Sequence, residues 1–296
     1  MILTFDNLAR SSIISTMRVS RRRFLRWTLV GVGATGLGCL GGPAYAALIE
    51  PRWLTLERVE VGLAGLPAHL DGLRIGLLSD LHHGPLVPTE QVERAVALLQ
   101  SQAPDLICLT GDYVSGSADF APSCAAELGR LDAPHGVYAC LGNHDHWTDP
   151  EQVASALESQ GIQVLRNRAV EATAGLWVAG VDDVWERQAD LETALAEVPP
   201  SAPAILLAHE PDFADEVAAD GRVALQLSGH SHGGQVRLPI IGPPILPYLG
   251  RKYPAGLHRI GPMQLYVSRG IGVISPPVRF RCRPEVSVLE LRSAPP

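Results

Sequence analysis

The stretch IGLLSDLH at residues 75–82 places two polar side chains, Asp80 and His82, directly after an apolar run. Such a run is typical of a strand that is buried in a parallel sheet. Other apolar runs in the chain also end in polar motifs, namely GD at 111–112, GNHD at 142–145, His209 and GHSH at 229–232. Polar side chains at the carboxyl ends of several strands form the site of an α/β sheet. The sequence therefore predicts an α/β fold with one composite site.

The residue types in these motifs are those that bind metal ions. Carboxylate and amide oxygens together with imidazole nitrogens fit Mn, Fe or Zn better than Mg or Ca. We expect Asp80 and His82 to face the same way, and likewise His230 and His232, because residues two apart on an extended backbone share a face. Each residue alone could instead be a helix cap, a turn residue or a surface histidine, but five motifs in a fixed order favour a metal site.

The charges of the chain are unevenly distributed. Residues 1–46 contain six arginines and one acid, Asp6, and the remaining 250 residues contain 18 basic and 30 acidic side chains, a net charge of −12. Binding to nucleic acid relies on basic side chains that neutralise phosphates, so an acidic body argues against it. We therefore expect no nucleic-acid partner, and we expect the protein to be a monomer.

The N-terminus resembles a twin-arginine signal. Arg21 and Arg22 precede a Gly-rich apolar stretch at residues 27–40, and Ala-Tyr-Ala at 44–46 has the small-x-small pattern of a cleavage site. The apolar stretch is shorter than the roughly 20 residues that span a bilayer, so a retained membrane anchor is the weaker interpretation.

These features predict the organisation of the chain. We expect residues 1–46 to be the signal segment and residues 47–296 to be a single domain. Export by the twin-arginine route would place the protein in the periplasm or cell envelope, with association to the membrane left open. A lipoprotein interpretation at Cys39 is weaker than the twin-arginine one, because Gly36 stands where such motifs usually have Leu.

Hydrophobic spacing predicts alternating strands and helices over most of the chain. We expect helices at 89–101, 121–131, 150–160, 190–198 and 213–219. Besides the strands that precede the motifs, we expect strands at 54–61, 163–165, 176–181, 264–268 and 286–291. Alternation followed by a strand-rich end predicts two packed sheets flanked by helices in one domain.

The order D-x-H, GD, GNHD, H and GHxH is similar to that of the calcineurin-like metallophosphoesterase family. The resemblance covers roughly residues 73–235 at the level of motifs. The signal, GGQ at 233–235 and SRG at 268–270 resemble the exported bacterial branch of this family. The resemblance implies a four-layer α/β/β/α sandwich of two mixed sheets and a centre of two divalent metal ions.

The resemblance also implies which residues hold the two ions. The first ion would be bound by Asp80, His82 and His232. The second would be bound by Asn143, His209 and His230. The carboxylate of Asp112 would bridge both ions.

Four further residues are candidates for roles beside the ions. His144 matches the family position that meets the substrate phosphate or protonates the leaving oxygen, and Asp145 would orient it. His146 and Arg269 are candidates for substrate binding. The competing interpretations are an exposed loop residue for His146 and an ordinary salt-bridging residue for Arg269.

This chemistry suggests a function. Two ions about 3.5–4 Å apart can clamp a phosphoryl group, and a metal-bound hydroxide can attack in line. We expect an exported metal-dependent phosphoric ester hydrolase, with a phosphodiesterase favoured over a monoesterase. Two alternatives stay open: a metal-containing cell-envelope binding protein without turnover, and a UDP-sugar-lipid pyrophosphate hydrolase. The export signal argues against the second alternative, because its substrate is cytoplasmic.

A proline-rich apolar segment, LPIIGPPILPYL at residues 238–249, follows shortly after the GHSH motif. We call this segment the lip. Its prolines exclude a helix. The lip is either a loop that packs into the core or an apolar surface that contacts acyl chains or a membrane. In the second case the substrate would be a lipid or cell-envelope phosphodiester.

Overall fold

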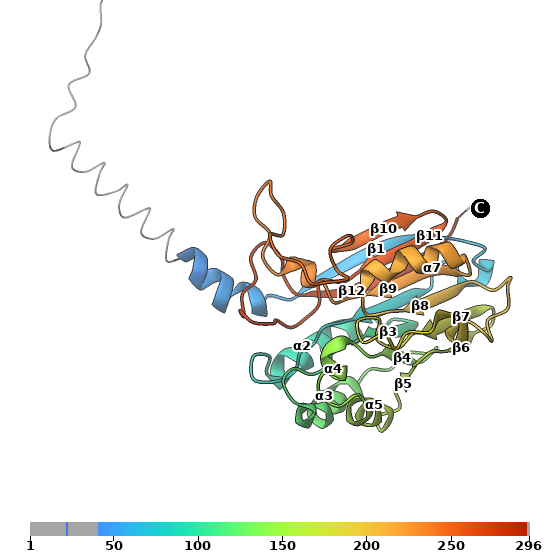
Figure 1. Ribbon diagram of the computed structural model, residues 1–296, viewed down its shortest axis with the longest axis horizontal. Coiled ribbons are helices and arrows are strands. Elements are labelled where there is room, and N and C mark those ends of the chain that lie inside the picture. Colours follow the sequence, from blue (N-terminus) through green and yellow to red (C-terminus); the bar gives the residue numbers. More distant parts are fainter. Residues whose placement is uncertain (1–21, 23–40, 295–296) are drawn as a thin grey trace, which may run out of the picture. The chain divides into compact units, whose positions relative to one another are not determined.

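The computed structural model describes residue 22 and residues 41–294 (Figure 1). The chain divides into two compact units, residues 1–43 and 44–296, and every described strand belongs to the second. Most of the expected signal segment, including Arg21 and the apolar stretch at 27–40, lies outside the described residues. Among the residues that are described, no helix is long and apolar enough to span a bilayer.

The described strands form two six-stranded sheets. In order across the first sheet they are β1 (Thr55–Ala64), β12 (Glu285–Ala294), β2 (Arg74–Leu78), β3 (Leu106–Thr110), β4 (Val137–Cys140) and β5 (Gln163–Val164). In order across the second they are β10 (Gly256–Ile260), β11 (Met263–Val267), β9 (Val223–Ser228), β8 (Ala204–Leu207), β7 (Leu176–Gly180) and β6 (Arg168–Thr173). Both sheets are mixed: β2 to β5 run parallel while β12 is antiparallel to β2, and β6 and β10 are antiparallel edges on a parallel centre.

Helices cover the outer faces of both sheets. The first sheet packs against α2 (Thr89–Gln100), α3 (Ala121–Leu128) and α5 (Pro150–Glu158), which Figure 1 shows grouped together. The second packs against α6 (Leu191–Ala194) and α7 (Ala214–Asp220). A third apolar cluster joins the inner faces of the two sheets. These three clusters separate four layers, so the expected α/β/β/α sandwich of two mixed sheets is confirmed.

The structure departs from the predicted elements in a few places. The helix expected at 190–198 is only one turn, α6, because Asp190 caps its start and Leu195 already leaves the helical conformation. The edge strands β6 and β10 were not expected. One helical turn, α4 (Asn143–His146), forms within the GNHD motif itself.

Short 3-10 turns connect several of these elements. They are η1 (Glu50–Arg52), η2 (Ala68–Leu70), η3 (Ala118–Phe120), η4 (Pro211–Phe213) and η5 (His232–Gly234). The polar motifs follow β2, β3 and β4 in the first sheet and β8 and β9 in the second. Because these strands run parallel within each sheet, their carboxyl ends reach the same edge, and the motif loops meet there.

The packing of α2 on β2 gives a test of the outer core. Leu99 is buried above Gly76, where an added Cβ would lie 2.8 Å from Leu99 Cδ1. We expect Leu99→Ala to lower the free energy of unfolding by about 2–5 kcal/mol, measured by denaturant titration. The half-buried neighbour Leu98 is the control: it packs at the edge of the same apolar cluster, so Leu98→Ala removes the same atoms with a smaller expected loss. Equal losses in the two variants would contradict this packing.

Candidate metal centre

Four buried side chains from both sheets converge at the shared edge. Asp80, His82, Asp112 and His232 each offer one ligand atom, and these atoms all lie within 4.8 Å of one another. Nε2 of His82 lies 2.9 Å from Nε2 of His232 and 3.4 Å from Oδ2 of Asp112. Nε2 of His232 lies 3.4 Å from Oδ1 of Asp80. The residues assigned to the first ion are therefore brought together.

The remaining predicted ligands form a second group that also meets Asp112. Its Oδ2 is 3.2 Å from Nε2 of His209, and Nδ1 of His230 is 3.0 Å from Oδ1 of Asn143. His209, His230 and Asn143 are all buried. Asp112 thus contacts histidines of both groups, which is the position that a bridging ligand requires.

Two candidate ligand atoms of this cluster lack the hydrogen bonds that would satisfy them. Nδ1 of His209 donates to the carbonyl of Thr110 at 2.6 Å, so Nε2 is the ring nitrogen that faces the cluster. That Nε2 and Oδ2 of Asp80 are buried without a hydrogen-bond partner among the described residues. An unsatisfied buried polar atom costs about 1–3 kcal/mol. Divalent cations would satisfy these atoms, and the residues present therefore fit a metal centre.

The pKa values of the histidines agree with this role. Burial lowers the pKa of His82 and of His230 to about 3 and that of His232 well below its ordinary value. These rings are neutral at pH 7, which is the form that binds metals. Burial alone would also lower the pKa of His209, but the charge of Asp112 raises it well above its ordinary value. A proton on His209 balances Asp112 here, and metal binding would release it.

The ligand loops do not have the extended backbone that the sequence analysis assumed. Five ligands have positive φ values, between 49° and 67°: Asp80, His82, Asp112, His230 and His232. The expectation that His230 and His232 share a face is wrong, since they point into different groups. Left-handed φ values in non-glycine residues cost about 1–3 kcal/mol each and cluster at functional sites. Hydrogen bonds between the loops hold them, among them Asp80 N–H to the Gly111 carbonyl at 3.0 Å and His230 N–H to Asp80 Oδ1 at 2.9 Å.

Asp145 joins two of the ligand loops. Its buried carboxylate accepts hydrogen bonds from the backbone N–H groups of Asp112 at 2.8 Å, Tyr113 at 2.9 Å and Gly142 at 3.0 Å. A contact with the ring of His144, as the resemblance implied, is not among the hydrogen bonds of the described residues. In this structure Asp145 positions the backbone of Asp112.

His144 is placed at the open side of the cluster. Its half-buried ring lies with its centroid 4.6 Å from that of His82, and its backbone N–H donates to Oδ1 of Asp112 at 2.9 Å. Within the described part of the chain neither ring nitrogen has a hydrogen-bond partner. The imidazole is therefore free to contact a molecule bound at the ligand cluster.

His146 is engaged by a carboxylate. Its Nε2 lies 2.7 Å from Oδ1 of Asp182, whose second oxygen accepts from Arg166 at 2.7 Å. Burial would lower the pKa of His146, but the hydrogen bond and charge of Asp182 raise it. His146 is thus bound within a network of side chains with Asp182 and Arg166. His146 is not one of the residues that converge on Asp112.

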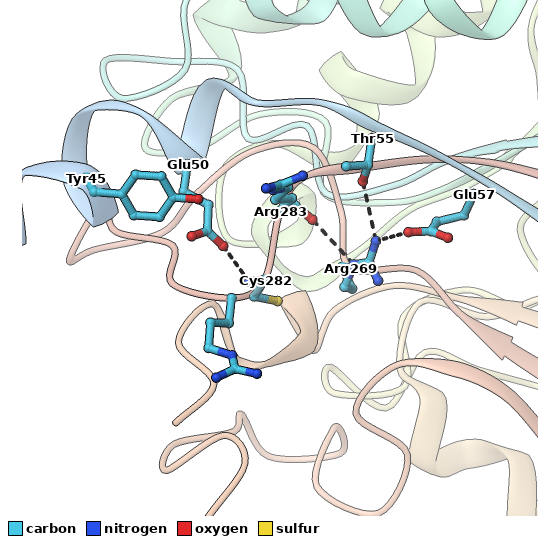
Figure 2. Close-up of a pocket in the computed structure, with 8 residues that line it drawn as sticks. Tyr45, Glu50, Thr55, Glu57, Arg269, Cys282 and Arg283 are labelled. Atoms are coloured by element: carbon cyan, nitrogen blue, oxygen red, sulfur yellow. Dashed lines mark hydrogen bonds and ion pairs between the residues drawn. The ribbon is translucent and has the colours of Figure 1, made fainter. Parts of the chain in front are cut away.

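Arg269 lies in a different cavity, of about 370 Å³, shown in Figure 2. Its guanidinium pairs with Glu57 at 2.6 Å and Glu285 at 2.8 Å, and it also contacts Thr55. No metal-ligand candidate lines this cavity. The structure therefore does not bring Arg269 to the cluster.

Arg279 supports the site and was missed in the sequence analysis. Its buried guanidinium donates to the carbonyl oxygens of Gly272 at 2.6 Å and Arg269 at 2.8 Å. This holds the turn at 269–272 against Asp80, where an added Cβ on Gly270 would lie 2.6 Å from the Asp80 Cβ. No sequence signal separates Arg279 from the arginines that follow it.

A second missed contact involves Tyr248, in the lip. Its carbonyl accepts a hydrogen bond from Nε2 of His230 at 2.7 Å. This leaves Nδ1 of His230 without a proton and facing Asn143 Oδ1. Such outer contacts fix the tautomer of a ligand histidine. The lip is therefore connected directly to the candidate metal centre.

The model of the calcineurin-like phosphoesterase family matches residues 73–234, which span every predicted metal ligand. This chain belongs to that family. Membership implies a metal-dependent phosphoester hydrolase, and the buried Asp and His cluster agrees with divalent metal binding.

Two relatives are similar over nearly their whole length. The phosphodiesterase YaeI of Escherichia coli (strain K12) is 36% identical over 284 residues, which cover 92% of this chain and 99% of that protein. The uncharacterized metallophosphoesterase YkuE of Bacillus subtilis (strain 168) is 34% identical over 283 residues, covering 93% and 99%. Among solved structures, TT1561 of Thermus thermophilus aligns with 68% of this chain and 90% of its own, with 15% identity and a TM-score of 0.47.

The close approach of Gly229 to Asp80 gives a test of the ligand geometry. A Cβ on Gly229 would lie 1.8 Å from Ser79 Oγ and 2.3 Å from Asp80 Oδ2. We expect Gly229→Ala to displace Asp80 and to lower the bound metal per chain, measured by elemental analysis. Gly62→Ala is the control, because its Cβ would lie 3.3 Å from that of Ala294 in the first sheet. Full metal content in Gly229→Ala would contradict the close packing of Gly229 against Asp80 as a requirement of the ligand geometry.

Proposed function

We propose that this protein is an exported two-metal phosphodiesterase. The observation that carries the proposal is the convergence of buried Asp, Asn and His donor atoms from five strand ends, with Asp112 between two groups of histidines. The name of the similar phosphodiesterase YaeI supports a diester as the substrate. The paired arginines and apolar stretch near the N-terminus support export.

The proposal assigns the ligands to two ions. The first ion would be held by Asp80, His82 and His232. The second would be held by Asn143, His209 and His230. Asp112 would bind both. Mixed nitrogen and oxygen donors favour Mn, Fe or Zn. Ions held in this way supply Lewis acidity for the phosphoryl oxygens and lower the pKa of a water.

The side chains of the protein supply the remaining functions. The free ring nitrogens of His144 would bind a phosphoryl oxygen or donate a proton to the leaving oxygen. The hydrogen bond from the His144 N–H to Asp112 Oδ1 keeps that ring over the cluster. Asp145 holds the Asp112 loop in place through backbone N–H groups. Positioning of the ligands and contact with substrate thus belong to different residues.

Two substitutions separate metal binding from turnover. Asp112→Asn weakens the ligand that touches both groups, so we expect it to lower metal content and hydrolysis of bis-p-nitrophenyl phosphate together. His144→Ala removes no ligand, so metal content is expected to stay and turnover to fall by about 10²–10⁴, the usual effect of losing an acid–base group.

The exposed residue His69 provides the control for this comparison, and His69→Ala is expected to match the unmodified protein in both measurements. Loss of metal from His144→Ala would mean that His144 is a ligand. Full activity after complete removal of metal by a chelator, or fewer than two ions per active chain, would contradict the two-metal proposal.

The proposed export has its own test. Twin-arginine transport requires the arginine pair, so we expect Arg21→Lys together with Arg22→Lys to retain the precursor in the cytoplasm. Cell fractionation followed by immunoblotting measures this. The single change Arg18→Lys, which leaves the pair intact, is the control. Normal export of the double variant would exclude the twin-arginine route.

A further inference from the structure

The lip exposes large apolar side chains at the surface. Ile240 is 107% exposed, Ile245 79%, Ile241 73% and Tyr248 57%. Isolated exposed apolar residues are common, but a contiguous group usually marks a surface that binds something. The interpretation of the lip as a loop packed into the core therefore does not account for its tip.

The backbone of the tip adds a second observation. Leu238 and Gly242 form an isolated antiparallel β-bridge, with N to O distances of 2.8 and 2.9 Å in the two directions. Figure 1 shows the segment between β9 and β10 rising from the sheets as a narrow orange loop. Ile240, at its tip, has a φ of 70°. A β-branched residue is disfavoured in that conformation, where Gly or Asn is preferred. An isoleucine at this position is unfavourable both because its apolar side chain is exposed to water and because its backbone conformation disfavours a β-branched residue.

The segment that contains the lip carries basic side chains and no acidic ones. Residues 221–284 contain nine Lys or Arg and no Asp or Glu, whereas the rest of residues 47–296 contains nine basic and 30 acidic side chains. Arg237 and Arg251 flank the lip directly, whereas the next residue, Lys252, is paired with Asp215 at 2.7 Å. The Arg237 N–H donates to the carbonyl of Phe280 at 2.8 Å, which brings the exposed Arg281 beside the base of the lip. A basic border around an apolar tip matches the charge of an anionic lipid surface.

A cavity leads from the lip to the metal centre. It measures about 330 Å³ and lies between the lip and the segment at 274–278. Its apolar walls include Leu246, Ile274 and Val278, and the ligands His230 and His232 also line it. An acyl chain in this cavity would thus lie against two of the proposed metal ligands.

The base of the lip is fixed relative to the site. The carboxylate of Asp212 accepts hydrogen bonds from the backbone N–H groups of Arg251 and Lys252, each at 3.0 Å, and of Tyr253 at 3.2 Å. The Tyr248 carbonyl is bound to His230, as described above. These contacts hold the lip next to the metal ligands. A surface that binds the tip of the lip therefore also brings the candidate metal centre close to that surface.

We propose that the lip inserts into an anionic lipid surface and that the substrate is a lipid phosphodiester. Its acyl chain enters the cavity below the lip while its phosphoryl group reaches the metal centre. The identity of the substrate rests on the phosphodiesterase function proposed above. Insertion of the lip does not depend on that function, because no metal ligand lies in the tip.

Insertion is measured on the full chain after removal of metal, with vesicles of phosphatidylglycerol and phosphatidylcholine that carry brominated acyl chains. We expect the added fluorescence of Ile241→Trp to shift to the blue and to be quenched in these vesicles, but not in pure phosphatidylcholine. Leu86→Trp is the control, since Leu86 is an exposed apolar residue outside the lip. The signal is local, so lipid contact elsewhere in the chain does not produce it.

Absence of quenching in Ile241→Trp would overturn the proposal. A blue shift already present without vesicles would overturn it too, because another part of the chain would then cover the lip. Quenching that is equal in Leu86→Trp would also exclude a specific role for the tip.

The substrate is tested with Ile240→Asn, which suits the positive φ and removes the apolar side chain. We expect vesicle binding to fall about tenfold, the melting temperature to stay or rise, and turnover of a lipid diester to fall relative to that of a soluble diester. Leu86→Asn is the control. A lower melting temperature with equal losses on both substrates would overturn the proposal. Insertion without hydrolysis of any diester would instead refute only the function proposed above.

Discussion

The carboxylate of Asp112 is the contact on which the arrangement of the site depends. One oxygen faces His82 at 3.4 Å and His209 at 3.2 Å, and the other accepts the N–H of His144. His82 follows a strand of the first sheet and His209 a strand of the second, so this group contacts ligands from both sheets. Asp145 stabilises it by binding the Asp112 N–H. The geometry of the metal ligands therefore depends on how the two sheets pack against each other.

The sequence predicted the fold and the residues that gather at the sheet edge, because both depend on short local patterns. Apolar runs predicted the central strands, and the motifs after them predicted the cluster around Asp112. The edge strand β6, with the sequence RAVEAT, was not predicted, because its pairing with β7 and not its own apolar pattern makes it a strand. Arg279 was missed for a related reason: its partners are backbone carbonyl groups, which no side-chain pattern reveals.

The local conformation of the ligands was the weakest inference from sequence. An extended backbone would have turned His230 and His232 the same way, whereas their positive φ values direct one ring toward Asn143 and the other toward Asp80. Strain of this kind depends on hydrogen bonds between loops that are far apart in the chain. It also means that the ligand loops are stable only as a group, since each loop is held by its neighbours.

The position of the last strand bears on how the molecule is made. β12 lies between β1 and β2 and pairs with both, although it follows every other described strand along the chain. During synthesis on the ribosome, β1 and β2 therefore cannot become part of one sheet until β12 has emerged. The turn at 269–272, which packs against Asp80, also emerges long after Asp80 itself. A nascent chain that ends before this turn thus has no complete ion-binding centre, and loading with metal must follow synthesis of the turn.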